Sequence, residues 1–189
     1  IQFHIENGTN GIVPCGTTGE SPSLRFEEHI RVIELAVQAA KGRVKILAGT
    51  GANATTEAIN LTKAAEAVGA DGSLQVSPYY NKPSQEGLFQ HFRKIARATK
   101  LPIILYSIPG RCNIAIEVPT VLRLAKACSN IVGIKEAGGD ADRVSQLRAA
   151  LGQRFSILSG DDALTLPFMA VGAEGVISVA SNIIPWEIS

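Results

Sequence analysis

Signals for binding large charged or apolar partners are scarce in this sequence. The 18 Lys and Arg residues balance 17 Asp and Glu to a formal net charge of +1, so the overall charge does not favour binding to nucleic acid or to an anionic membrane. No apolar run approaches the roughly 20 residues that span a bilayer. We therefore expect a globular protein with neither nucleic acid nor membrane as a partner.

Cysteine and histidine are also scarce. The three cysteines lie far apart and form no CxxC pair, which disfavours a zinc site and a disulfide framework and favours a reducing compartment such as the cytoplasm. The three histidines, His4, His29 and His91, fall on predicted helices, and the chain has no HxH or HExxH motif. We expect chemistry that uses neither a metal ion nor a cofactor.

The sequence does contain a regular alternation of short apolar runs with longer amphipathic segments. Nearly continuous apolar runs are typical of parallel strands that are covered on both faces. Seven runs predict strands, at residues 11–15, 44–48, 73–76, 103–108, 131–134, 155–158 and 175–179. The intervening segments predict helices, most clearly at residues 25–41, 56–68, 85–99, 118–127 and 141–151.

The spacing of these seven βα steps predicts an α/β fold of the (β/α)8, or TIM, barrel type. An open doubly wound sheet is less favoured, because the turn CGTTG at residues 15–19 is not the GxGxxG fingerprint. A barrel needs eight strands and typically about 250 residues. Residues 1–9 predict the end of a helix, so we interpret residues 1–189 as one partial, truncated barrel with the second to eighth strands.

Active sites of such barrels lie at the C-terminal ends of the strands, where Lys135 follows the apolar run at residues 131–134. Burial there would lower the pKa of the ammonium group, and a neutral amine attacks ketones and aldehydes to form a Schiff base. The alternative from position alone is a structural lysine, ion-paired to Glu136 or to another carboxylate at the rim.

Other polar residues fall at the same predicted end of the barrel. Thr17 and Thr18 lie on a tight turn, where their hydroxyl groups could bind a carboxylate and relay a proton. The alternative is that the turn only caps the following helix. Tyr106 can shuttle a proton or serve as a core tyrosine, and Arg111 can clamp a carboxylate or lie on the surface. The Asp161-Asp162 pair, at residues 161–162, is interpreted mainly as a helix cap.

Six segments together resemble signatures of the dihydrodipicolinate synthase family, within the pyruvate-dependent Schiff-base aldolases and lyases. The resemblance covers the whole chain and implies a lyase that condenses pyruvate with L-aspartate 4-semialdehyde, without a cofactor, in the first committed step of lysine and diaminopimelate synthesis. It also implies that the first strand and a C-terminal helical extension are absent here. The segments are GTTGES (16–21), PYYNKP (78–83), LYSIPGR (105–111), GIKEA (133–137), SGDD (159–162) and GVISV (175–179).

The resemblance assigns roles to residues that match the family's motifs. It implies that Lys135 forms the Schiff base and that Tyr106 relays protons to and from it. It also implies that Thr17 takes part in this relay and that Tyr80 is inserted into the site of a neighbouring subunit. It implies that the substrates are held by Thr18, Arg111, Gly160 and Ile177, of which Thr18 would bind the pyruvate carboxylate and Arg111 that of the aldehyde. Near these residues, this chain differs from the residues most often found in the family at Ser107, at residues 112–113 and at Gly138.

The resemblance further implies a homo-oligomer, of the tetramer type, and a separate interface site for the inhibitor L-lysine. The matching positions are His29, Asn53, Glu57 and Tyr79. Phe26 stands where lysine-sensitive relatives often have histidine, which removes one polar partner.

Two other functions remain open from the sequence. A sister lyase would act on N-acetylneuraminate or a keto-deoxy sugar acid, but Arg111 favours an aldehyde that carries its own carboxylate. A barrel that binds a small acid without turnover would be favoured if Lys135 were ion-paired and unreactive.

Overall fold

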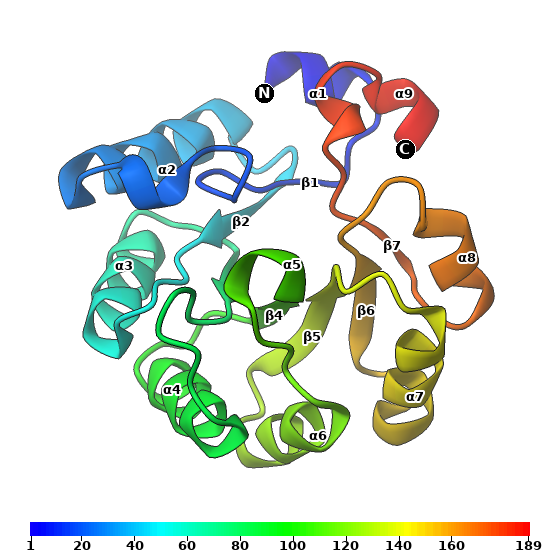
Figure 1. The fold of residues 1–189 in the computed structure, drawn as a ribbon. Helices are drawn as coiled ribbons and strands as arrows, with labels where there is room; N and C mark the ends of the chain where they lie inside the picture. Colours follow the sequence, from blue (N-terminus) through cyan, green and yellow to red (C-terminus); the bar gives the residue numbers. More distant parts are fainter.

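The computed structural model describes residues 1–189 and contains one sheet of seven parallel strands surrounded by helices (Figure 1). The strands follow one another in sequence order, and each pairs only with its neighbours. They are β1 (Gly11–Ile12), β2 (Lys45–Gly49), β3 (Gly72–Val76), β4 (Ile103–Ser107), β5 (Ile131–Glu136), β6 (Ser156–Ser159) and β7 (Gly175–Val176). The predicted barrel architecture is confirmed, with seven of its strands in this chain.

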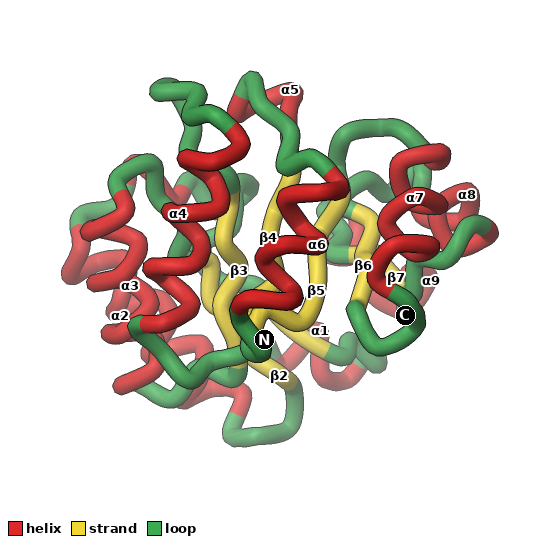
Figure 2. Tube along the Cα trace, turned by 90° about the horizontal axis from the view of Figure 1, so that it is seen from below, coloured by secondary structure: helices red, strands yellow, loops and turns green.

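Most helices lie outside the ring of strands, as Figure 2 shows from the side, and one short helix lies over its end (Figure 1). All five predicted helices are confirmed to within two residues at either end. The helices are α1 (Gln2–Glu6), α2 (Phe26–Ala40), α3 (Thr55–Ala67), α4 (Gln85–Arg97), α5 (Pro109–Cys112), α6 (Val118–Ala127), α7 (Ala141–Leu151), α8 (Thr165–Ala170) and α9 (Pro185–Ile188), with 3-10 turns η1 (Ser21–Ser23) and η2 (Ala180–Asn182). None of them combines the length and the apolar character that a membrane crossing requires.

The two edge strands are shorter than predicted, since β1 and β7 each keep two residues of a predicted five. After β1, Pro14 has no N–H to donate to a neighbouring strand, and Cys15 adopts a left-handed conformation with φ 55° that turns the chain. The terminal helices α1 and α9 lie side by side (Figure 1), and Ser189 Oγ donates a 3.1 Å hydrogen bond to the Asn7 carbonyl. The assignment of the visible strands as second to eighth stays a prediction.

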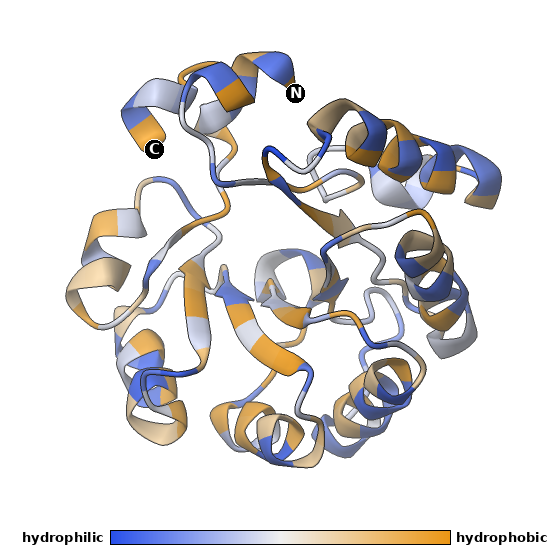
Figure 3. Cartoon of the chain, turned by 180° about the vertical axis from the view of Figure 1, so that it is seen from behind, coloured by the Kyte–Doolittle hydropathy of each residue, from blue (hydrophilic) through white to orange (hydrophobic).

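The sheet divides the apolar residues into an outer and an inner layer. The outer layer joins the sheet to α3, α4, α6 and α7, and includes Leu105 and Ile134. The inner layer contains residues of the strands and their following turns, with Leu74, Ile104 and Tyr106 buried at its centre. Figure 3 shows hydrophobic residues along the central strands, whereas the surrounding helices mix hydrophobic and hydrophilic residues. This inner layer supports the C-terminal end of the barrel.

A register shift in β5 decides which side chains face inward. Ile103 pairs with Ile131, but Ile104 pairs with Gly133, so β5 contains one extra residue. Ile131 and Ile134 therefore both face the outer layer although three positions separate them. Because a one-residue shift moves the following side chains to the opposite face, it turns Lys135 inward, opposite Tyr106. Gly133 permits the shift, since a Cβ there would come within 2.7 Å of the Ser156 carbonyl oxygen.

Candidate active site

Lys135 is a buried amine without an ionic partner. Its residue is 8% exposed, and it takes part in none of the ion pairs of the chain. Burial lowers the pKa of Lys135 to about 8, against an opposing effect of the Asp162 charge. Glu136 instead pairs with Arg143, 2.8 Å away. The alternative of a lysine ion-paired at the rim is therefore wrong, and a reactive amine fits the geometry.

Tyr106 lies against this amine, because the two residues are in register on β4 and β5. The Lys135 Nζ is 4.3 Å from the centroid of the Tyr106 ring. Burial raises the pKa of Tyr106, while a side-chain hydrogen bond with Thr17 and the charge of Arg111 act in the opposite direction. The structure thus brings Lys135, Tyr106 and Thr17 together, with Arg111 close enough to act on the phenol.

Gly160 follows β6, the strand beside that of Lys135, and Ile177 follows β7, the next strand of the sheet. A Cβ on Gly160 would lie 3.0 Å from the Lys135 Cε and 2.7 Å from the Ala137 Cβ, so only glycine leaves the lysine its room. The Ile177 N–H donates a 2.9 Å hydrogen bond to the Ser159 carbonyl, and its side chain packs against the inner layer around Tyr106. Their predicted roles in substrate binding have compatible positions and stay predictions.

The Thr17 turn closes one side of the site. Cys15, Gly16, Thr17 and Tyr106 are among the residues that line a small, partly open pocket. Thr18 is exposed on the same turn, and its predicted contact with a carboxylate stays a prediction. Helix α5, which sequence periodicity missed because it is a single turn, lies over the barrel end and exposes Arg111 there (Figure 1).

The two adjacent aspartates separate into different roles. Asp161 Oδ1 accepts hydrogen bonds from the N–H groups of Ala163 and Leu164, at 2.9 and 3.2 Å, which agrees with the capping interpretation. Asp162 Oδ2 instead accepts from the N–H groups that follow β7, and it is the anion that opposes the lowered pKa of Lys135. The sequence interpretation missed this electrostatic role, for which the only signal was the position of Asp162 after a strand.

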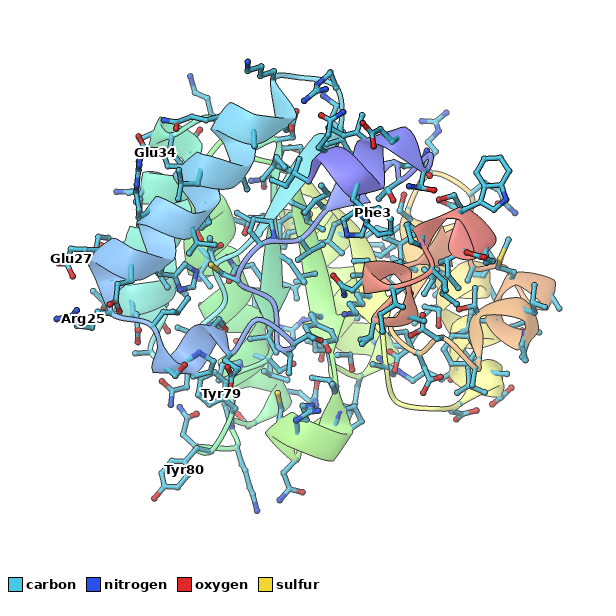
Figure 4. All side chains as sticks on the ribbon, turned by 90° about the horizontal axis from the view of Figure 1, so that it is seen from above. Phe3, Arg25, Glu27, Glu34, Tyr79 and Tyr80 are labelled. Carbon is cyan, nitrogen blue, oxygen red and sulfur yellow. The ribbon has the colours of Figure 1, made fainter.

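Tyr80 does not contribute to this cluster within one chain. The residue is 90% exposed and has φ 73°, an uncommon backbone conformation for a residue with a side chain. Figure 4 shows its side chain extending away from the ribbon beside Tyr79. A role in the site of the same chain is thereby disfavoured, and a role in a neighbouring subunit stays a prediction.

Three of the four residues predicted to bind L-lysine line a second, partly open cavity. His29, Glu57 and Tyr79 line it, together with Phe26. Asn53 is not part of its lining, but the Asn53 backbone hydrogen-bonds Tyr79. The buried His29 ring already hydrogen-bonds the Gly49 carbonyl oxygen through Nε2, at 2.7 Å.

These features define a class of protein, namely a β/α barrel with a buried, unpaired amine at the C-terminal end of a strand. The model of the dihydrodipicolinate synthetase family matches residues 1–189. The chain therefore belongs to this family.

Named relatives agree with that assignment. The chain is 61% identical to a 4-hydroxy-tetrahydrodipicolinate synthase of Sulfurihydrogenibium sp. and 57% identical to that of Aquifex aeolicus, over 100% of this chain in both cases. It spans 64% of the length of each of these two relatives. The solved synthase of Methylacidiphilum fumariolicum SolV is 63% identical with a TM-score of 0.99, over 100% of this chain and 63% of that chain.

Proposed function

We propose that this protein condenses pyruvate with L-aspartate 4-semialdehyde, the 4-hydroxy-tetrahydrodipicolinate synthase reaction, in the cytoplasm and at the start of lysine and diaminopimelate synthesis. The observation that carries the proposal is the unpaired amine of Lys135, with its pKa of about 8, against the Tyr106 ring. At that pKa roughly a tenth of the side chains are neutral at pH 7, against fewer than about one in a thousand for an ordinary lysine.

The proposed reaction begins when the Lys135 amine attacks the ketone carbon of pyruvate. Loss of water gives an iminium ion, and removal of a methyl proton gives an enamine that attacks the aldehyde carbon. Tyr106 is suited to carry these protons, since the amine lies over its ring and its side chain hydrogen-bonds Thr17. Cyclisation and release of the lysine follow. A solved synthase of Acinetobacter baumannii, 51% identical and with a TM-score of 0.96, was complexed with pyruvate, which supports the choice of keto acid.

Substrate choice provides the test of the proposal. We expect Arg111→Gln to raise the KM for L-aspartate 4-semialdehyde at least about tenfold, since a charge-assisted bond to its carboxylate is lost, while capture of pyruvate continues. Arg25→Gln, at the exposed residue that precedes α2 (Figure 4), is the control and should behave as the unmodified protein. Steady-state assays with the semialdehyde and with N-acetylmannosamine decide the question. Turnover of the sugar alone would favour the sister lyase, and no turnover of either would favour a binding protein.

We propose also that the active form is a homotetramer in which Tyr80 completes the site of a partner chain. Its 90% exposure leaves a large aromatic side chain free to reach a second copy. Tyr80→Phe and Lys135→Ala chains, each inactive alone, should recover activity when mixed, because a hybrid dimer contains one intact site. Activity is measured after confirmed subunit exchange. Unchanged inactivity in proven hybrids would refute this role of Tyr80.

L-Lysine is the proposed inhibitor at the second cavity. A synthase of Cyanidioschyzon merolae, 46% identical and with a TM-score of 0.96, was solved with lysine bound, and here Glu57 offers a carboxylate for an ammonium group. We expect inhibition at millimolar lysine, weakened at least about tenfold by Glu57→Ala, since a hydrogen bond to a charged group contributes about 1.5–3 kcal/mol. Glu27→Ala, exposed on α2, is the matched control. Equal inhibition of both variants, or none at all, would remove this site from the proposal.

A further inference from the structure

Glu136, the residue after Lys135, is a fully buried carboxylate on the opposite face of β5. Its Oε2 accepts a hydrogen bond from the Arg143 Nε at 2.8 Å, and its Oε1 accepts one from the Gly138 N–H at 2.7 Å. Arg143 comes from α7, and its side chain is 15% exposed. An ion pair thus lies behind the candidate nucleophile, outside the barrel.

This pair continues to the neighbouring strand. Arg143 Nη2 donates to the carbonyl oxygen of Ile116, and the Ile116 N–H donates to the Ser107 Oγ at 3.3 Å. Ser107 ends β4 and is in register with Glu136, one position after the register pair of Tyr106 and Lys135. The side chains of Glu136 and Arg143 therefore connect the end of β5 to the end of β4.

Lys135 depends on such support from its backbone. Its ammonium group has no ionic partner, so only the strand and the packing around it fix its distance from Tyr106. Charge-assisted bonds from a guanidinium are short and directional, which makes them suited to fixing a strand end. Stability alone gives a weak reason for the pair, because buried ion pairs are often replaced by apolar groups at no cost.

We propose that Glu136 and Arg143 are positioning residues that hold Lys135 at its working distance from Tyr106. The proposal rests on the proposed function, because it takes Lys135 as the group that captures pyruvate. Neither residue touches the substrate. They act through the β5 backbone and through Ile116 and Ser107, so the rate of Schiff-base formation depends on them more than the binding of pyruvate does.

The test compares Glu136→Gln with the unmodified protein in single-turnover trapping of pyruvate by borohydride. We expect the limiting rate to fall at least about tenfold, since small misplacements of reacting groups cost up to about 10²-fold. The pyruvate concentration at half-maximal rate should change less than about threefold, and the pH midpoint should not move, because Asp162 and not Glu136 acts on the charge of Lys135. Glu174→Gln, which breaks the Arg148 pair before β7, controls for loss of an ion pair and should keep the full rate.

Ser107→Ala provides a second variant, which removes only the last link to β4 and decides the question if Glu136→Gln does not fold. A slower limiting rate with unchanged half-saturation supports the proposal. Unmodified rates in the folded variants, or an equal loss in Glu174→Gln, would overturn it. Failure of the unmodified protein to form any adduct would instead overturn the proposed function, so the two failures are distinguishable.

Discussion

Lys135→Met is expected to abolish turnover, with a loss of at least about 10³-fold, because no other group in the site can form a Schiff base. Methionine keeps the length and apolar stem of the lysine, so the packing against Tyr106 and Gly160 is retained. Steady-state assay of the condensation measures the loss, and thermal unfolding checks that the variant is folded.

Lys45→Met is the matched control for this substitution. Lys45 begins β2, at the opposite end of the strand from the site, and is exposed and ion-paired to Asp71 at 2.7 Å. It should therefore retain full turnover. Substantial activity in folded Lys135→Met would contradict the assignment of the nucleophile.

Tyr106→Phe has the second largest expected effect, a fall in kcat of about 10²–10³-fold. The substitution removes only the phenolic oxygen and leaves the ring against the Lys135 amine. Proton transfer to and from the substrate would then lack its relay, whereas the shape of the binding site would be unchanged. We expect kcat to fall much more than KM rises, as steady-state kinetics can measure.

Thr17→Val serves as a graded comparison for Tyr106→Phe. It removes the hydroxyl that hydrogen-bonds Tyr106 but keeps the phenol. The loss in kcat should be smaller than for Tyr106→Phe. A Tyr106→Phe variant with the kcat of the unmodified protein would exclude the phenol as the relay.

The alternation of apolar runs was sufficient to predict the barrel and the placement of Lys135 at a strand end, since both follow from local patterns. That the Lys135 side chain points into the barrel could not be predicted from the run IVGIK alone. The extra residue, Val132 between Ile131 and Gly133, shifts the register, and shifts of this kind depend on the neighbouring strand rather than on local sequence.

Side-chain contacts between different helices and strands were the other feature that the sequence could not predict. The pairing of Glu136 with Arg143 depends on how α7 packs beside β5, and so the adjacent Lys135 was an equally plausible partner from sequence alone. Tyr80 illustrates the same limit, because its 90% exposure appears only once the fold is known. The sequence predicted a cap at residues 161–162. Only the fold shows that Asp161 caps the turn, whereas the charge of Asp162 acts on Lys135.

The most direct measurement is the pH dependence of pyruvate trapping by borohydride, with the modified residue located by peptide mass spectrometry. The neutral amine is the nucleophile, so adduct formation should rise with pH and level off above the pKa of about 8. The account predicts one pyruvate-derived adduct per chain, on Lys135, with that midpoint. An adduct on another lysine, no adduct, or a midpoint near the ordinary lysine value would contradict it.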